Sequence, residues 1–414
     1  MNPLRSLMLR MALKGTDLTL TSPQGWQLVG DGATWAKVPV RESTQLQISA
    51  AFSAIRLIAE TVGTLPLRLM RKTDKGTERM VKDPRYGLVH DQPNEYMTAV
   101  EWKEAMTVSL ATMGQSYNYV EAFESTGRIV SIQPVHKSRV QPEILHDGAI
   151  RYWVSKRNGT REQVGRQRVC PIRGFGGVGE LEGYAPHKLH ANSLALTVAV
   201  EKYGAEFFGS GARPTGIITT KTDLSGDKRE QVRQGFAKYM RESWNKGELP
   251  VLDSDTAYQS VTTPNNDAQF IETRKLQIAE IARIYRVPLH MLMEMDKASY
   301  ANTEQANKHF LDYTLLSYLR RIEAGLDSSL LTPAERASGM FFQFDVRGLL
   351  RGDSTQRANY YVSMRNAGAM TQNEIRDLED MQRIEGADDL HVPLNMAPSD
   401  MLADYLAGKN KGAS

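Results

Sequence analysis

The chain has 414 residues, enough for two or three domains, and its 51 Lys and Arg against 48 Asp and Glu leave a formal charge of only +3. Hydrophobic residues make up 41% and charged residues 24%, which is typical of a globular protein with a substantial core. The small net charge argues against a protein that grips nucleic-acid phosphates through a large basic excess. A single cysteine, Cys170, excludes an intrachain disulfide framework and a cysteine-based zinc cluster, and suits a reducing cytoplasm.

The N-terminal residues 1–44 are predicted to form an extended arm, because they are rich in Gly, Ser, Thr and Pro and show no sustained period. Arg10 and Lys14 interrupt their apolar start, so we expect no signal peptide. The longest uncharged stretch, residues 105–120, is too short and too polar to span a bilayer. We therefore expect no contact with a membrane.

Two helices are predicted in the first third of the chain. Apolar residues recur at helical spacing from a cap at Ser43 or Thr44 to Val62, and Gly63 and Pro66 should end this helix. Thr98 and Glu101 form a capping box before a second helix over 99–113.

Strands are predicted to follow. Alternating side chains predict strands over 117–123 and 128–135, with a turn at 125–127 between them. Residues 149–155 predict a further strand, and Asn158-Gly159 is a hairpin signal. Residues 45–191 therefore predict an α+β module.

The second half of the chain is predicted to be mainly helical. Helical spacing and end signals predict helices over residues 192–208, 225–245, 266–287, 302–326, 355–365 and 372–378. Short strands are predicted at 216–220, 250–252, 258–261 and 340–344. Asn266 with Gln269, and Asn302 with Gln305, are expected to cap the third and fourth of these helices.

One glycine pattern could indicate a nucleotide-binding enzyme, but it has a simpler structural interpretation. Gly174, Gly176 and Gly179 fit the dinucleotide pattern G-x-G-x-x-G, but no helix start follows, so we favour a structural loop. No phosphate-binding G-x-x-x-x-G-K-[ST] occurs, so any ATP-driven step must come from a partner.

A second hypothesis is a metal- or cysteine-dependent enzyme that acts on nucleic acid. It would use Cys170, His187 and His190, but this set has neither a third metal ligand nor a positioned base. We expect no catalytic residue, no metal and no cofactor. On the helix over 225–245, the aromatic and basic residues could suggest stacking on nucleic-acid bases, but we favour an amphipathic helix with an aromatic core face and a charged exterior. These residues are Phe236, Lys238, Tyr239, Arg241 and Trp244.

A series of short stretches carries a resemblance to a known family, and they occur in order over about residues 45–396. They are residues 51–60, 65–67, 91–94, 207–208, 211–214, 267–270, 274–275, 278–284, 287–288, 349–353, 370–374 and 392–395. In these stretches and their order, the chain resembles tailed-bacteriophage portal proteins of the siphophage type.

The resemblance implies the α+β portal fold, in which subunits, commonly twelve, close a ring at one capsid vertex. Its parts map onto this chain as an N-terminal arm (1–44), a wing (45–191), a first stem helix (192–212), a clip (213–265), a second stem helix (266–292), a tunnel loop (293–301), a tunnel helix with a returning wing strand (302–349), and a crown with the C-terminal tail (350–414).

The resemblance also implies a non-enzymatic function and a set of partners. The ring would be the channel for packaging and ejecting double-stranded DNA, in the virion and, during assembly, in the host cytoplasm. Expected partners are the terminase large subunit, head-tail adaptor or connector proteins, the major capsid protein and the scaffolding protein. The clip residues expected to dock such partners are Lys221, Asp223, Lys238, Arg241 and Trp244.

A channel for long duplex DNA should not hold any one phosphate tightly. Residues 266–310 carry six Lys or Arg and six Asp or Glu, a balance that favours sliding over anchoring. The residues expected to form the tunnel loop near the DNA are Asp296, Lys297, Ala298, Ser299 and Tyr300, with Lys297 and Tyr300 closest. Those expected to pack the stem and the ring are Phe270, Ile278, Ile281 and Ile284.

Overall fold

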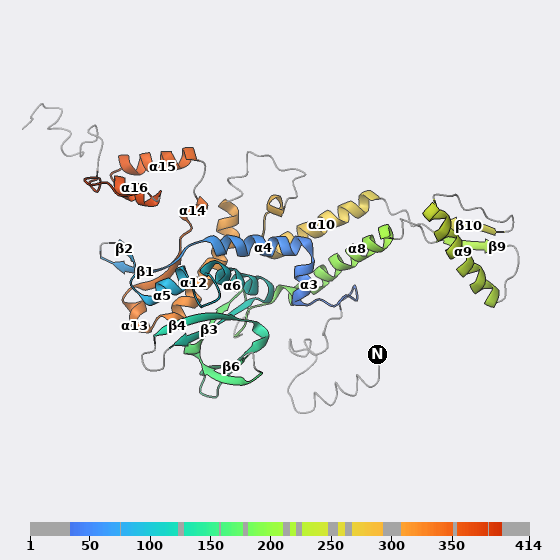
Figure 1. Cartoon of the computed structure of the whole chain (residues 1–414), viewed down its shortest axis with the longest axis horizontal. Coiled ribbons are helices and arrows are strands. Elements are labelled where there is room, and N and C mark those ends of the chain that lie inside the picture. Colours follow the sequence, from blue (N-terminus) through green and yellow to red (C-terminus); the bar gives the residue numbers. More distant parts are fainter. Residues whose placement is uncertain are drawn as a thin grey trace, which may run out of the picture. The chain divides into compact units, whose positions relative to one another are not determined.

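The computed structural model of the chain is mixed helix and sheet, α+β as the sequence predicts (Figure 1). It describes residues 34–74, 76–122, 128–156, 159–176, 181–209, 216–220, 226–246, 256–260, 267–292, 308–350, 354–379 and 381–390. In that part of the chain, no helix is long and apolar enough to cross a membrane. The predicted turn at 125–127 and the predicted strand at 250–252 lie outside the described residues.

The chain forms two compact units, each made of several segments. The first unit contains Met1–Leu57, Val108–Gln115 and Gly174–Met295. The second contains Ile58–Thr107, Ser116–Arg173 and Asp296–Ser414.

Most predicted elements are found close to their predicted ends. The described helices are α3 (Glu42–Gln47), α4 (Ser49–Thr64), α5 (Pro84–His90), α6 (Ala99–Met113), η1 (Lys137–Arg139), η2 (Arg166–Arg168), α7 (Pro186–Leu189), α8 (Ala191–Gly209), α9 (Gly226–Lys246), α10 (Asp267–Tyr285), η3 (Leu289–Leu292), η5 (Leu311–Leu315), α12 (Leu316–Leu330), α13 (Pro333–Ala337), α14 (Arg347–Leu350), α15 (Ser354–Asn366) and α16 (Gln372–Leu378). The strands are β1 (Leu67–Thr73), β2 (Gly76–Arg79), β3 (Gln115–Ala122), β4 (Ile129–Val135), β5 (Val140–Ile144), β6 (Ile150–Ser155), β7 (Arg161–Gly165), β8 (Val169–Arg173), β9 (Gly216–Thr220), β10 (Thr256–Ser260) and β11 (Met340–Phe344).

The first predicted helix is in fact two helices. Ile48 has extended backbone angles (φ −77°, ψ 115°) and separates α3 from α4. The predicted cap was also wrong: Thr44 lies inside α3, and its hydroxyl accepts a hydrogen bond from the backbone N–H of Arg41 at 3.0 Å. The predicted end is confirmed, since α4 finishes at Thr64.

Helix α6 begins as its capping box predicts. The carboxylate of Glu101 accepts from the backbone N–H of Thr98 at 2.7 Å, and the Thr98 hydroxyl accepts from the N–H of Glu101 at 3.3 Å. Further along, the indole of Trp102 is fully buried and donates to the side-chain oxygen of Asn118 on β3 at 2.8 Å. This hydrogen bond joins α6 to the strand β3.

One sheet has the strand order β11-β1-β2 and joins distant parts of the chain. β1 and β11 pair antiparallel, with Leu67 opposite Phe344. On the edge of β11 that does not pair with β1, two carboxylates of α12 accept backbone hydrogen bonds. Glu323 accepts from the N–H of Phe344 at 2.8 Å, and Asp327 accepts from the N–H of Phe342 at 2.7 Å. Burial raises the pKa of both carboxyls.

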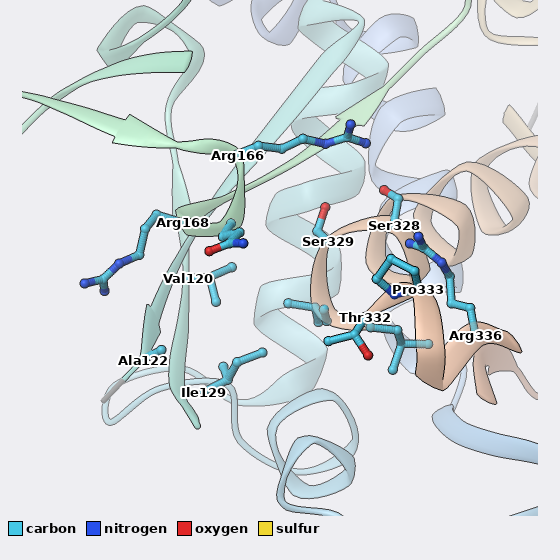
Figure 2. A pocket seen from close by; sticks show the side chains of 13 residues that line it. Val120, Ala122, Ile129, Arg166, Arg168, Ser328, Ser329, Thr332, Pro333 and Arg336 are labelled. Carbon is cyan, nitrogen blue, oxygen red and sulfur yellow. The ribbon is translucent and has the colours of Figure 1, made fainter. Parts of the chain in front are cut away.

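Two further three-stranded sheets, β4-β3-β8 and β5-β6-β7, enclose a small shared core. Tyr117 and Tyr152 meet edge-on there, with ring centroids 6.1 Å apart. The predicted hairpin after β6 is confirmed, and Gly159 takes the positive φ of 83° that its turn requires. Between β7 and β8, η2 lies across a cavity from the end of α12 (Figure 2).

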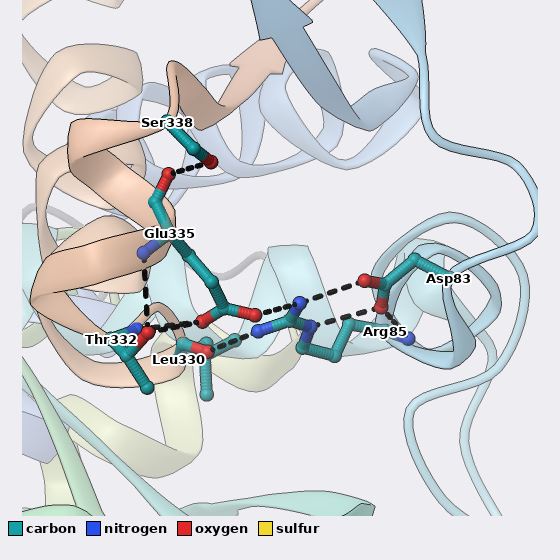
Figure 3. A network of polar contacts seen from close by, with 6 residues as sticks. All are labelled: Asp83, Arg85, Leu330, Thr332, Glu335 and Ser338. Atoms are coloured by element: carbon teal, nitrogen blue, oxygen red, sulfur yellow. Dashed lines mark hydrogen bonds and ion pairs between the residues drawn. The ribbon is translucent and has the colours of Figure 1, made fainter.

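Arg85 joins the start of α5 to the turn between α12 and α13 (Figure 3). Its guanidinium donates to both carboxylate oxygens of Asp83 at 2.9 and 2.7 Å, to Glu335 at 2.6 Å and to the carbonyl of Leu330 at 2.9 Å. Arg85 lowers the pKa of Asp83, and it lowers that of Glu335 to about 2. Glu335 also completes a capping box with Thr332 at the start of α13.

The fourth sheet is a pair of strands in the first unit, β9 and β10, with Ile218 opposite Tyr258. The helix α9 lies between them in sequence. In the second unit, the described part of the predicted helix over 302–326 is α-helical at both ends but contains a π-helical turn, η5.

Candidate protein-contact surface on the helices α8 and α10

The helices α8 and α10 pack side by side, as their close contacts show (Figure 1). Gly204 of α8 makes room for the ring of Phe270, because a Cβ at this glycine would lie 2.7 Å from the Phe270 Cζ. The rings of Tyr203 and Phe270 lie with centroids 6.4 Å apart, and Arg274 forms an ion pair with Glu201 at 3.4 Å.

One end of each helix is anchored in the core of the first unit. Leu194, near the start of α8, is fully buried, and so is most of Tyr285 at the end of α10. The Tyr285 hydroxyl donates to the side-chain oxygen of the buried Gln45 at 2.8 Å, and the Gln45 amide donates to the carbonyl of Thr112 at 3.2 Å. This chain of hydrogen bonds joins three distant segments.

The same two helices leave large apolar side chains in water. Leu196 and Tyr203 on α8 are 53% and 48% exposed, and Ile271 and Leu276 on α10 are 54% and 59% exposed. Exposed apolar side chains gathered on one pair of elements are typical of surfaces that contact other proteins. We name these four residues the stem surface.

The four residues predicted to pack the stem and the ring are covered to different extents within the chain. Ile281 is only 2% exposed, so the chain's own core already covers it, while Phe270, Ile278 and Ile284 are half-buried. The sequence analysis missed Ile271 and Leu276. Ile271 lies seven residues before Ile278, in the same apolar stripe of α10, whereas Leu276 lies outside it, so helical spacing alone does not show which side chains the fold leaves uncovered.

The other predicted site residues are only partly described. Asp296, Lys297, Ala298, Ser299 and Tyr300 lie outside the described residues, and so do Lys221 and Asp223. Lys238 is exposed on α9, and Arg241 and Trp244 lie within the same helix.

The hypothesis of a cysteine or metal site gains no support from the described residues. Cys170 is fully buried, and burial raises the pKa of its thiol to about 12, which opposes formation of a thiolate nucleophile. The Nδ1 of His187 lies 3.0 Å from the carbonyl of Thr112, so it donates a structural hydrogen bond. No group of three or more His, Cys, Asp or Glu side chains in the described part of the chain could hold a metal ion.

The predicted glycine loop serves packing. Gly174 donates its backbone N–H to the carbonyl of Gly114 at 2.9 Å. A Cβ at Gly174 would lie 2.7 Å from that carbonyl oxygen, and one at Gly183 would lie 2.2 Å from it. Three backbone segments therefore meet where only glycine fits, which accounts for Gly174 without a bound nucleotide.

The helices α8 and α10 are thus anchored in the core at one end and present large apolar side chains to solvent. The family model for phage portal proteins matches residues 49–380. The chain belongs to the phage portal protein family.

Relatives of known sequence agree with this assignment. The chain is 29% identical to the portal protein of Enterobacteria phage HK97 over 381 residues, which cover 90% of this chain and 88% of that one. It is 25% identical to the probable portal protein of Streptomyces phage phiC31 over 402 residues, covering 93% and 86% of the two chains.

Solved structures show the same fold. An HK97 family phage portal protein from Corynebacterium diphtheriae matches with a TM-score of 0.56 and 18% identity, over 77% of this chain and 97% of that one. A chain in the neck of a native gene transfer agent particle, computed with C12 symmetry, matches with a TM-score of 0.56 and 20% identity, over 88% and 100% of the two chains. The portal fold expected from the sequence is confirmed, and membership of a structural family fits a protein without catalytic function.

Proposed function

We propose that copies of this chain, twelve in number, close into a ring at one capsid vertex and form the channel through which double-stranded DNA is packaged and ejected. The observation that carries the proposal is the stem surface in a chain of the portal family. Two helices that bury only part of their apolar surface need neighbours to cover the rest. A repeated contact between different faces of identical subunits closes into a ring when its rotation fits.

The regions of the chain then take the functions that the family order implies. We assign α8 and α10 to the stem, residues 213–265 to the clip and residues 45–191 to the wing, with the arm at 1–44 and the crown beyond 350. The segment 293–301 would be the tunnel loop, followed by the tunnel helix in 302–349.

The charge of the proposed channel supports sliding of DNA. The six basic and six acidic residues of 266–310 cancel, and each phosphate that a cation neutralises adds affinity that would slow translocation. Lys297 and Tyr300 would be the residues closest to the duplex, and Asp296 would repel it locally.

The proposed partners follow from the successive stages of virion assembly. The clip, with Lys238 exposed on α9, would dock the terminase large subunit and later the head-tail adaptor or connector proteins. The capsid and scaffolding proteins would meet the ring in the host cytoplasm, before the ring becomes part of the virion.

Negative-stain electron microscopy of the purified full chain tests the proposal. We expect annular particles with a central hole wide enough for a double helix and a native mass that is a multiple of the 46.4 kDa subunit. If only monomers form at every concentration, the channel function is wrong.

Deleting residues 296–300 tests the tunnel-loop assignment separately. Because this segment lies outside the stem surface, we expect the variant to form rings but to package or retain less DNA than the wild-type protein. Wild-type packaging yields would remove the loop from the channel's function.

A further inference from the structure

The second unit contains a groove to which the proposed ring assigns no function. Its larger part is a cavity of about 740 Å³ between β3, β4, η2 and the turn from α12 to α13 (Figure 2). A smaller cavity of about 300 Å³ beside Asp83 and Arg85 shares the lining residues Ile129, Leu330 and Thr332 with it. The two cavities are therefore parts of one groove.

The groove carries an excess of positive charge. Arg166, Arg168 and Arg336 are among the residues that line its larger part, and none of the described lining residues is a carboxylate. In Figure 2 the Arg168 side chain points away from the other lining side chains. Asp83 and Glu335 line the smaller part, but both carboxylates already bind the guanidinium of Arg85. Within the described residues, neither Arg166 nor Arg168 forms an ion pair with a carboxylate.

Between the arginines, the groove is mainly apolar. Val120, Ala122 and Ile129 line the side formed by β3 and β4, while Leu331 lines the opposite side. The hydroxyls of Ser329 and Thr332 lie between these sides (Figure 2). An apolar groove with arginines at its edge suits a peptide that combines apolar anchors with carboxylates.

We propose that this groove binds the acidic C-terminal segment 399–406 of this chain. The segment reads Ser-Asp-Met-Leu-Ala-Asp-Tyr-Leu, which places four large apolar residues around Asp400 and Asp404 and has no basic residue. It begins nine residues after Leu390, the last described residue, so an extended connection can reach about 30 Å. The assignment does not depend on ring formation.

The apolar segment at the other end of the chain is a poor match. Residues 4–14 also carry several large apolar side chains, but they include Arg5, Arg10 and Lys14 and no acidic residue. Their charge of +3 would be repelled by the arginines of the groove. Charge therefore selects the C-terminal segment over the N-terminal one.

Disulfide trapping in the full chain tests this assignment. Gln167 is exposed in the groove, so we combine Gln167→Cys with Leu402→Cys and oxidise with diamide. The native Cys170 is fully buried and its pKa is raised to about 12, so it should not react. We expect rapid crosslinking within one chain or between two chains, and either product supports the proposal.

Three comparisons make the result specific. Glu143→Cys, exposed on β5, replaces Gln167→Cys as a control outside the groove, and Leu7→Cys replaces Leu402→Cys as the N-terminal control. Both controls should crosslink at least about tenfold more slowly, because neither pair is brought together by binding. Equal rates for Gln167→Cys and Glu143→Cys would overturn the proposal, and faster trapping of Leu7→Cys would assign the groove to the N-terminal segment instead.

A charge exchange tests the electrostatic part. Asp400→Lys with Asp404→Lys should reduce trapping by at least about tenfold, and adding Arg166→Glu with Arg168→Glu should restore it. Asp400 and Asp404 lie beyond Leu390, the last described residue, and a loss of trapping without a change in circular dichroism reports binding. Trapping that is indifferent to the charge reversal would contradict the proposal.

Discussion

At the scale of single residues, Arg85 shows how one side chain can hold three segments. Arg85→Met would leave the carboxylates of Asp83 and Glu335 and the carbonyl of Leu330 without their shared donor. We expect a loss of about 3 kcal/mol in the free energy of unfolding at pH 7, measured by urea denaturation. The exposed pair Arg383–Asp377 is the matched control, and Arg383→Met should leave the free energy of unfolding nearly unchanged because solvent screens this pair.

The pH dependence of this effect has a definite sign. Arg85 lowers the pKa of Glu335 from 4.5 to about 2, so the stabilisation is complete above pH 4.5 and is lost as the pH falls towards 2. The difference between wild type and Arg85→Met should therefore shrink over this range. A difference that stays constant from pH 7 to pH 2.5 would mean that the ion pairs are not its source.

At the scale of elements, the outer edge of β11 depends on acceptors from α12. Glu323→Gln keeps an oxygen that can accept from the N–H of Phe344 and removes a buried charge, so its stability should stay within about 1 kcal/mol of wild type. Glu323→Leu leaves that buried N–H without an acceptor and should cost about 2 kcal/mol more. Thermal unfolding of the two variants measures the difference, and equal melting temperatures would show that the hydrogen bond is unimportant.

The close backbone contact of Gly114, Gly174 and Gly183 gives a second prediction at this scale. Gly183→Ala would place a Cβ 2.2 Å from the carbonyl oxygen of Gly114, a backbone atom that cannot move freely. We expect a loss of about 3 kcal/mol or more in urea unfolding. Gly165→Ala is the control, because a Cβ there meets no atom within 4 Å, and its effect should stay within about 0.5 kcal/mol.

The sequence predicted correctly those elements whose ends are set by residues close together in the chain. The capping box of Thr98 and Glu101 needs only residues three apart, and α6 begins where it predicts. The break at Ile48 has no such local signal in the sequence. Gln45, in the last turn of α3, accepts a hydrogen bond from Tyr285, 240 positions away, and no helical spacing reveals such a partner. The same limit applies to Ile281, which was predicted to pack the stem and the ring: helical spacing alone does not show that the chain's own core buries it.

At the scale of the whole molecule, the stem surface separates folding from assembly. Ile271→Asp with Leu276→Asp changes side chains that are more than half exposed, so each subunit should fold normally while each subunit contact loses about 2–5 kcal/mol. This loss recurs at every contact of a closed ring, so native mass spectrometry should find monomers where wild type gives rings.

Two further variants separate folding from assembly. Ile281→Asp places its charge in the core of the subunit, so it should lower the melting temperature of the subunit itself. Val81→Asp, at a residue that is 62% exposed after β2, is the control expected to form rings. If Ile271→Asp with Leu276→Asp forms rings as wild type does, the subunits meet through another surface.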